Sequence, residues 1–497
     1  MAQNKSNYNR NRKNKKSFNP NNPNQQHQRF ASTSAVFTGQ ASSNSNVDGT
    51  RLKSMLQDPA KNAQNVATVS KSMKQVNGMY KRVVKYMSSL LTFDYTIYPV
   101  MQNPLQDVGD ATTLQQAFAQ TAIFVDKLNP KFNLPIFTEK IFTNGVTYQY
   151  KIEDSKSTVY MDVPANLCRV SYLEEGVYRY QFDITKLTEA TMLTYPKEFQ
   201  TAYTAYRNGS TDQFVEGKWY QVSDKGVAFT IDTEVLQQAG QALPPLSNAL
   251  IDAIKIENAK DSMEDTATLD NSKIVHSQVP IDDKGRPTME LGVVMEYHNA
   301  LKRNLPAGAV AITNPFDTKA SSLNGTGKDG KFALLDKTID TLYDGVGVSK
   351  QLFAGDGTSS QALERSLQVD AQWMFSALLP MFTNYFNYEL KKAGKKGTIW
   401  KAKFLNITHM NREEAIATSK DQLTFGGSRL EYLAYCGMTP LEVANMLVFE
   451  QRVLSIDDYM VAKQTSNTLS GDPNAEEAGA PESDNPTDTT VRIKDSQ

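Results

Sequence analysis

The sequence predicts an α+β fold, and three observations support this prediction. Apolar residues recur at spacings of three and four in several long segments, which is the period of an amphipathic helix. In a central block, residues 146–152, the period changes to two, because apolar and polar residues alternate. Helical segments come first, strands follow, and helices return in the second half of the chain.

Composition excludes several classes of protein. The 497 residues carry 53 Lys and Arg against 54 Asp and Glu, so the formal net charge is −1. A protein whose main task is to grip nucleic acid carries a clear positive excess, which is missing here. The sequence has no run of about 18 apolar residues and no basic-then-apolar leader, so we expect neither a membrane span nor secretion. Two cysteines, Cys168 and Cys436, exclude a disulfide framework and fit a reducing compartment.

The two ends of the chain have opposite charge, and we expect both to be disordered. Residues 1–47 contain seven basic residues and no acidic one, and nine asparagines fall within the first 24 positions. Residues 466–497 contain seven acidic residues against Arg492 and Lys494. Neither segment has enough apolar surface to offset the entropy lost on folding. The basic tail either contacts a polyanion or an acidic protein surface, or it only adds solubility.

The first half of the body between these tails is expected to hold helices, then strands, then a short helix and a hairpin. Pro196 is suited to the first turn of the short helix, which carries Phe199, Tyr203 and Tyr206. The expected elements are helices over residues 73–91 and 112–128, strands over 146–152, 159–161 and 178–184, and a hairpin of 219–223 and 227–231 around Asp224-Lys225-Gly226.

The second half of the body is expected to be mainly helical. Pro380 lies inside the longest helical pattern, and its ring should kink that helix. The expected elements are helices from residue 246, over 291–303, 332–343 and 361–392, and from Thr439-Pro440 onward, with strands over 274–279, 310–312 and 404–408.

One fragment matches a nucleotide-binding motif. Residues 325–331 fit the first seven positions of the phosphate-binding loop G-x-x-x-x-G-K. The eighth position holds Phe332, where Ser or Thr would bind magnesium. An ATPase is therefore an alternative hypothesis, which requires ATP turnover that Lys331→Ala abolishes. The simpler interpretation is a solvated loop.

Other reactive residues do not assemble into a catalytic pattern. The histidines His276, His298 and His409 lie far apart, and Cys168 beside Arg169 has the pattern of a structural thiol. The carboxylate pairs Glu174-Glu175 and Asp282-Asp283 lie in turn-like contexts without an apolar pocket. We therefore expect no enzyme, no cofactor and no metal site.

Five segments together resemble the portal protein, or head–tail connector, of tailed bacteriophages that infect Gram-positive bacteria. Their order and spacing carry the resemblance, which covers residues 50–465. The segments are Tyr80 to Leu90, Tyr195-Pro-Lys-Glu-Phe199, Asn314-Pro315-Phe316-Asp317, Gly347 to Phe353, and Ser359 to Leu363 followed by the long helical pattern.

The resemblance implies a structural role in the virion, with assembly in the host cytoplasm. Portal subunits form a ring, usually of twelve copies, at one vertex of the capsid. Terminase docks on the ring during packaging, double-stranded DNA passes through its tunnel during packaging and ejection, and a head–tail adaptor attaches afterwards. The major capsid protein or a scaffold surrounds the ring. The alternative is another virion structural protein, a capsid or tail-adaptor component without a DNA channel.

The resemblance also divides the chain into parts. These would be an α+β wing (48–245), a first stem helix (246–269), a small α/β clip (270–325), a second stem helix region (326–353), a tunnel loop (354–361), the long kinked tunnel helix with a wing strand (362–427) and short crown helices (428–465), between the disordered tails 1–47 and 466–497.

Two groups of site residues follow from this division. The tunnel loop would touch DNA without gripping it, because Asp356 is its one charge and tight phosphate contacts would stop DNA from sliding. Four basic residues of the clip would contact DNA or terminase, although an ordinary solvated face is the simpler interpretation. The tunnel-loop residues are Gly355, Asp356, Gly357, Thr358, Ser359 and Ser360, and the clip residues are Lys284, Arg286, Lys302 and Arg303.

Overall fold

A computed structural model describes most of the chain between the two tails. The described residues are 48–101, 110–155, 157–210, 212–271, 273–284, 286–304, 309–314, 328–354, 360–394 and 399–455. Both predicted disordered tails and residues 355–359 of the predicted tunnel loop lie outside them. The chain divides into two compact units, Met1–Leu441 and Glu442–Gln497.

Three helices open the described chain: α2 (Gly49–Gln57), α3 (Pro59–Val76) and α4 (Gly78–Ser89). The prediction of one helix over residues 73–91 is wrong, because the helix breaks at Asn77. Asn77 has extended backbone angles, φ −90° and ψ 111°, and its side chain accepts a hydrogen bond from the Tyr80 N–H at 2.8 Å. The same side chain donates to the Ala253 carbonyl at 3.3 Å and to Glu257 Oε1 at 3.0 Å. A fully buried amide thus caps α4 and ties it to a distant helix.

Two further helices precede the sheet: α5 (Ala111–Leu128) and α6 (Pro130–Asn144). The prediction for residues 112–128 is confirmed. Helix α6 was not predicted, and Asn129 separates it from α5 by a left-handed turn with φ 47°. Pro130 occupies its first turn, where the missing N–H has no helical partner.

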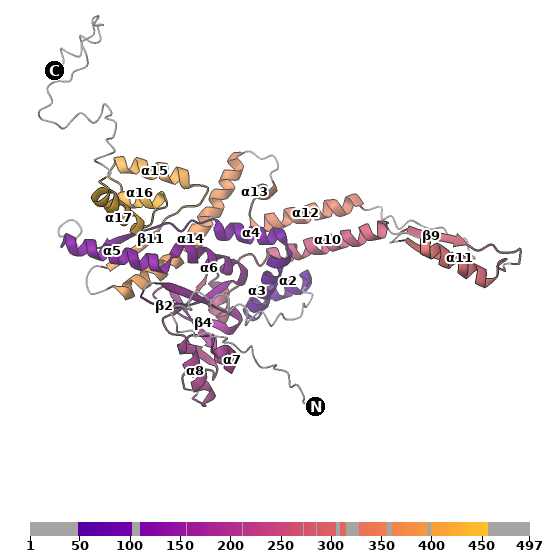
Figure 1. Cartoon of the computed structure of the whole chain (residues 1–497), viewed down its shortest axis with the longest axis horizontal. Coiled ribbons are helices and arrows are strands. Elements are labelled where there is room, and N and C mark those ends of the chain that lie inside the picture. The colour runs from indigo at the N-terminus through magenta and orange to yellow at the C-terminus, as the bar shows by residue number, and fades with distance from the viewer. Residues whose placement is uncertain are drawn as a thin grey trace, which may run out of the picture. The chain divides into compact units, whose positions relative to one another are not determined.

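A seven-stranded sheet forms the centre of the wing region (Figure 1). Its order is β3-β2-β8-β5-β7-β6, and β4 pairs with β5 outside this path. The strands are β2 (Val146–Glu153), β3 (Thr158–Val163), β4 (Cys168–Glu174), β5 (Val177–Asp183), β6 (Phe214–Val215), β7 (Trp219–Gln221) and β8 (Gly226–Thr230).

The predicted strands over 146–152, 159–161 and 178–184 are present, but the predicted hairpin is wrong. Strands β7 and β8 both pair with β5, at Asp183↔Trp219 and at Tyr178↔Ala228. The Arg179 side chain explains this arrangement, because Nη1 donates to the carbonyls of Asp224 and Gly226 at 2.9 and 2.8 Å. Hydrogen bonds from Arg179 of β5 therefore fix the turn between β7 and β8. The two strands do not pair directly with each other, because β5 lies between them.

Both faces of the sheet are buried at its central strands β2, β3, β5 and β8. One face packs into a core with the helices α7 (Glu189–Met192), α8 (Lys197–Arg207) and α9 (Glu234–Ala239). The predicted helix after Pro196 is confirmed as α8, with Phe199 and Tyr203 buried. On the other face, Phe229 stacks on Phe137 of α6 at 5.4 Å between ring centroids. The polar positions of β2 are buried as well, because α6 and a long later helix cover them.

The regions predicted as stem and clip contain two paired helices with a small α/β excursion between them. Helices α10 (Ala249–Asn271) and α12 (Lys328–Val346) lie side by side and contribute Leu250 and Leu342 to the main core (Figure 1). Between them the chain forms β9 (Lys273–Gln278), α11 (Leu291–Asn304) and β10 (Ala309–Asn314). Strands β9 and β10 are parallel, with Ile274 opposite Val310, and α11 packs on β10.

The longest helix, α14 (Ser360–Ala393), runs through the main core without a break at Pro380. The short helix α13 (Gln351–Ala354) precedes it, and β11 (Ile399–Phe404) follows and pairs antiparallel with β1 (Tyr95–Val100). The strand predicted at 404–408 is wrong in position, because pairing with β1 begins five residues earlier at Ile399 and only a bridge, Leu91↔Thr408, remains there. The kink at Pro380 stays a prediction.

The described chain ends with α15 (Arg412–Thr424), α16 (Arg429–Tyr435), α17 (Pro440–Val448) and a π-helical turn, η4 (Phe449–Val453). Helix α15 was not predicted, whereas α17 confirms the helical pattern after Thr439-Pro440. Within the described ranges, every helix is too short or too polar to cross a bilayer.

Candidate functional site

The excursion between α10 and α12, which the sequence analysis predicted to be a clip, contains the four basic residues singled out there. Lys284 and Arg286 lie in the turn before α11, and Lys302 and Arg303 lie in the last turn of that helix. All four are exposed. The turn is held by Asp282, whose Oδ1 accepts the backbone N–H groups of Lys284 at 3.0 Å and Arg286 at 2.7 Å.

Acidic residues balance this positive charge. Over residues 281–304 the chain has four acidic and four basic residues, and all eight are exposed. A surface that neutralises DNA phosphates needs an excess of positive charge, which is absent here. The acidic members are Asp282, Asp283, Glu290 and Glu296.

Residues 355–359 of the predicted tunnel loop lie outside the described residues, but the chain on both sides of them is well anchored. Ser360 begins α14. On the preceding side, the Phe353 ring stacks on Tyr343 at 5.5 Å, meets Tyr86 edge-on at 5.6 Å, and lies 5.0 Å from the Arg82 guanidinium. These contacts fix α13 against α4 and α12.

Tyr86 also holds the other side of this segment. Its hydroxyl donates to Asp370 Oδ2 of α14 at 2.9 Å. Burial raises the pKa of the Asp370 carboxyl above its usual range, and the Tyr86 hydrogen bond opposes this shift. One side chain of α4 therefore contacts the helix before residues 355–359 and the helix after them.

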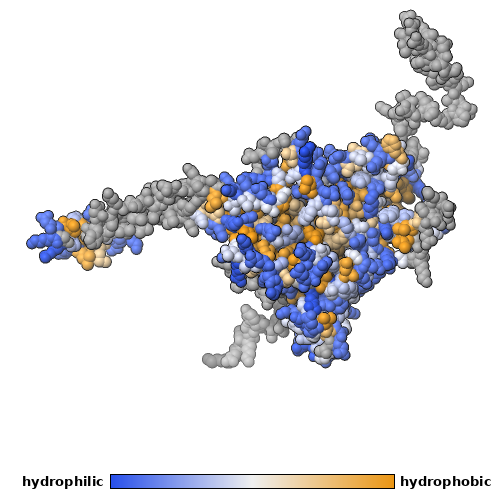
Figure 2. Space-filling model, turned by 180° about the vertical axis from the view of Figure 1, so that it is seen from behind, coloured by the Kyte–Doolittle hydropathy of each residue, from blue (hydrophilic) through white to orange (hydrophobic). Residues whose placement is uncertain are grey.

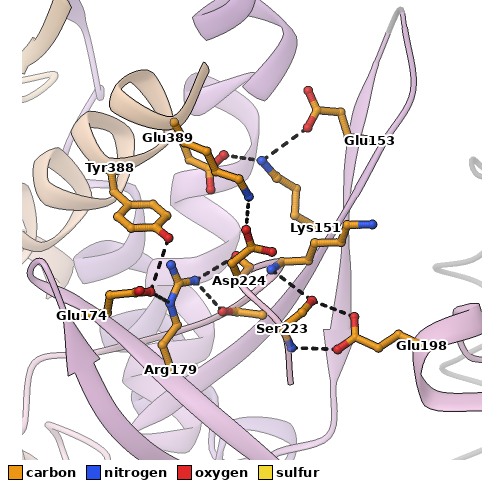
Figure 3. Close-up of polar contacts among 12 residues, drawn as sticks. Lys151, Glu153, Glu174, Arg179, Glu198, Ser223, Asp224, Tyr388 and Glu389 are labelled. Carbon is orange, nitrogen blue, oxygen red and sulfur yellow. Dashed lines mark hydrogen bonds and ion pairs between the residues drawn. The ribbon is translucent and has the colours of Figure 1, made fainter. Parts of the chain in front are cut away.

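A polar network joins the second half of α14 to the wing sheet (Figure 3). Lys151 of β2 forms a buried ion pair with Glu389 and a second ion pair with Glu153 at 3.3 Å. Lys392 pairs with Asp224 in the turn before β8, and this contact lowers the pKa of the Asp224 carboxyl. These contacts hold α14 against two parts of the sheet at once.

Arg179 is the centre of the same network. It is 1% exposed, and its Nε donates to Glu174 Oε2 at 2.8 Å. Its guanidinium lies 4.6 Å from the Tyr388 ring centroid, and the Tyr388 hydroxyl donates to Glu174 at 3.3 Å. A buried guanidinium with these partners fixes the distance between β5 and α14.

The sequence analysis missed this network, although it did single out Glu174. Lys151 occupies a polar position in an alternating strand, a pattern that predicts exposure. Only the packing of α14, more than two hundred residues later, buries it. A Lys in β2 and an Arg in β5, two strands that β8 separates in the sheet, each have an acidic residue nearby in sequence, and this is the weak signal that was available.

The other candidates do not form a site. Among the described residues, no three His, Cys, Asp or Glu side chains are placed to hold a metal ion. Cys168 is fully buried, and burial raises the pKa of its thiol, as expected for a structural cysteine. His298 Nδ1 lies 3.0 Å from Thr313 Oγ1 inside the clip. Gly330 and Lys331 of the phosphate-loop fragment belong to α12, and residues 325–327 lie outside the described chain.

Comparison with solved structures finds similar chains. The fold resembles a chain in the structure entitled "Virion of native gene transfer agent (GTA) particle", with a TM-score of 0.39 and 13% sequence identity. The likeness covers 72% of this chain and 88% of that one. No family model matches the sequence, and no curated protein matches it.

Proposed function

We propose that this chain is a virion structural protein, and specifically a portal subunit. Copies of it would form a ring at one capsid vertex, through which DNA enters and leaves, and on which terminase and then the head–tail adaptor dock. The portal is not an enzyme in this proposal, because the motor activity of packaging belongs to terminase.

One observation carries the proposal. Two helices that pack on each other, α10 and α12, enclose a small β9-α11-β10 excursion, and a long core helix, α14, follows them. This is the order that the family resemblance implies for stem, clip, stem and tunnel helix. The strand β11 then pairs with β1, which returns the chain to the wing region.

Two further features fit a channel that DNA must slide through. The chain is close to neutral, so a ring of copies would not bind phosphates tightly. The segment proposed to line the tunnel starts from α13 and ends in α14, both of which contact Tyr86. A loop held firmly at both ends can approach DNA without collapsing into the channel.

Electron microscopy of the purified chain, combined with its mass in solution, tests the proposal. Closed rings with a central hole wide enough for a DNA duplex are expected. Shells, tubes or fibres would contradict the portal role and favour the alternative, a capsid or tail-adaptor component.

A packaging assay tests the proposed tunnel loop. Asp356→Lys adds positive charge to each copy of the loop, so DNA movement is expected to slow or stall while rings still assemble. Unchanged packaging rates would show that this loop does not line the tunnel. An exposed aspartate away from this segment, Asp421→Lys on α15, is the control for a general effect of added charge.

A further inference from the structure

Positive charge is concentrated on three helices that pack on one another, α3, α4 and α6. Together these helices contain eight basic residues and one acidic residue, Glu139, although the whole chain has a net charge of −1. Figure 2 shows hydrophobic and hydrophilic residues interspersed over one face of the molecule, so hydropathy does not single out a binding surface there. The sign of the charge does single out these three helices.

Four lysines of α3 and α4 lie around Glu139 of α6. Lys74 Nζ is 2.5 Å from Glu139 Oε1, and Lys85 Nζ is 2.6 Å from Glu139 Oε2. Lys71 precedes Lys74 by three residues and therefore lies on the same side of α3. Lys81 precedes Lys85 by four residues and lies on the same side of α4. These four lysines, with one carboxylate among them, form the α3/α4 basic face.

The positive charge of this face is not neutralised by its own surroundings. Lys71 and Lys81 are exposed, and neither forms an ion pair with an acidic side chain among the described residues. Lys85 is 55% exposed, although it pairs with Glu139. Burial opposes ionisation of Glu139, but Lys74 and Lys85 lower the pKa of its carboxyl below the usual range. The ionised carboxylate cancels one of the four positive charges, so three remain.

The other exposed side chains of α3 and α4 suit a duplex phosphate backbone better than a protein or a single strand. Ser72 and Gln75 are exposed and can donate hydrogen bonds to phosphate oxygens. The structure describes both helices completely, and Val76 is the one large apolar side chain exposed on them. Protein interfaces are built around apolar and aromatic anchors, and single strands stack their bases on exposed aromatic rings. The α3/α4 basic face offers charge without such anchors or rings.

We propose that the α3/α4 basic face binds the phosphate backbone of duplex DNA. The lysines neutralise phosphates and release counterions, so the contact depends on salt and does not read the base sequence. It is separate from the proposed tunnel loop, residues 354–361, which contains no lysine. The face holds DNA in place, whereas the tunnel loop is proposed to let DNA slide. The choice of DNA over another duplex rests on the proposed function, and the charge arrangement does not.

A binding assay with two lysines replaced tests the proposal. Lys71→Gln combined with Lys81→Gln removes two positive charges and breaks no ion pair of the described residues, so the chain should still fold. Affinity for a fluorescent DNA duplex of random sequence should fall about tenfold or more at about 50 mM salt, and the slope of log K against log salt concentration should become shallower by about two. Fluorescence anisotropy between about 50 and 200 mM salt measures both quantities, and thermal unfolding checks the fold.

A matched pair of lysines outside the face controls for a general loss of charge. Lys401 of β11 and Lys420 of α15 are exposed, and replacing both by Gln removes the same charge as the first double variant. This control should bind DNA like the wild-type chain. The basic residues 1–47 are common to all variants, so the difference between the two double variants measures the contribution of the face. Equal losses in both variants, or no loss in either, would overturn the proposal.

Removing the carboxylate should have the opposite effect. Glu139→Gln keeps an oxygen that accepts a hydrogen bond from Lys74 or Lys85, and it adds one net positive charge to the face. Affinity for the duplex should rise severalfold, and the salt slope should become steeper by about one. Weaker or unchanged binding by a folded Glu139→Gln chain would contradict the proposed contact.

The outcomes distinguish DNA from an acidic protein, and this face from the portal role. Polyglutamate that binds more tightly than the duplex, and that loses this binding in the Lys71→Gln/Lys81→Gln chain, would overturn DNA as the ligand and assign the face to an acidic protein. Rings that bind DNA equally well with and without the two lysines would overturn the face and leave the portal proposal standing. Shells or fibres whose DNA binding depends on the two lysines would support the face and overturn the portal role.

Discussion

The helices α14 and α11 complete their packing in opposite ways. Helix α14 lies in the main core, and charged residues of its second half find partners on the sheet, as Glu389 does with Lys151. Helix α11 has no buried residue, and its charged residues face solvent. The contrast teaches that one region of this molecule is stabilised by packing in the core, whereas the helix of the other region buries no side chain. Predictions on stability should therefore show large effects around α14 and small ones on α11.

The buried ion pair of Lys151 and Glu389 is expected to show the largest effect. Lys151→Met leaves the Glu389 carboxylate buried with its main partner removed, which should lower the free energy of unfolding by about 3–5 kcal/mol. Replacing both residues, Lys151→Met with Glu389→Leu, should cost less than the single change, because no unpaired charge remains. Urea unfolding followed by circular dichroism measures both.

An exposed pair on the same helix provides the matched control. Lys391 pairs with Glu175 at 2.7 Å, and both side chains are more than half exposed. Lys391→Met should change the free energy of unfolding by less than about 1 kcal/mol. Equal losses of unfolding free energy in Lys151→Met and Lys391→Met would show that burial does not make the first ion pair more important for stability than the second.

The break at Asn77 is expected to show the next largest effect. Asn77→Ala removes the cap of α4 and leaves the Ala253 carbonyl without its side-chain donor, so a loss of about 2 kcal/mol is expected. The exposed cap Ser428 of α16 accepts a single bond, from the Glu431 N–H at 3.2 Å. Ser428→Ala should therefore cost about 1 kcal/mol or less in the same urea unfolding experiment. A larger loss at Ser428 than at Asn77 would contradict the role given to the buried amide.

The contribution of Asp370 to the free energy of unfolding should depend on pH. Its pKa is raised in the folded chain, so the folded state loses stability as the pH rises from the usual carboxyl range through this raised pKa. Asp370→Asn can still accept the Tyr86 hydrogen bond and should gain up to about 1 kcal/mol at neutral pH. The gain should vanish at low pH, where the wild-type carboxyl is protonated. Urea midpoints between about pH 4 and 7 test this, and a pH-independent difference would refute it.

The smallest effect is expected for a methionine of α11, and a methionine of α14 provides the contrast. Met295→Ser on α11 should change the unfolding free energy of the isolated chain by less than about 0.5 kcal/mol, because that side chain is exposed. Met374→Ser on α14 should cost about 3 kcal/mol, because its side chain is fully buried. A substantial loss at Met295 in the monomer would mean that the clip is completed within its own chain.

Local patterns predicted elements well where one face of a helix or strand decides its position. The bounds of α11 and of α5 follow from apolar spacing, and they agree with the structure within about one residue. The same reasoning missed the break at Asn77, because the apolar period continues across it. The partners of that amide, Ala253 and Glu257, lie far away in sequence.

Long-range packing also explains the other errors. The hairpin between β7 and β8 was predicted from a good local turn, but Arg179 holds that turn from β5. Lys151 has the sequence pattern of an exposed residue and becomes buried only because α14 covers it. The basic residues before and at the end of α11 were found from sequence, whereas the exposure of its apolar residues became visible only in the structure.

The hydrogen bond between Tyr86 and Asp370 has a consequence for how the chain is made. Its two residues are 284 positions apart, so at about 5–20 residues per second the ribosome needs roughly 15–60 s to synthesise the second after the first. During this interval the apolar sides of α4 and α6 have no α14 to cover them. The nascent chain must therefore be protected by a chaperone, or by transient packing of its own early helices, until its last third emerges.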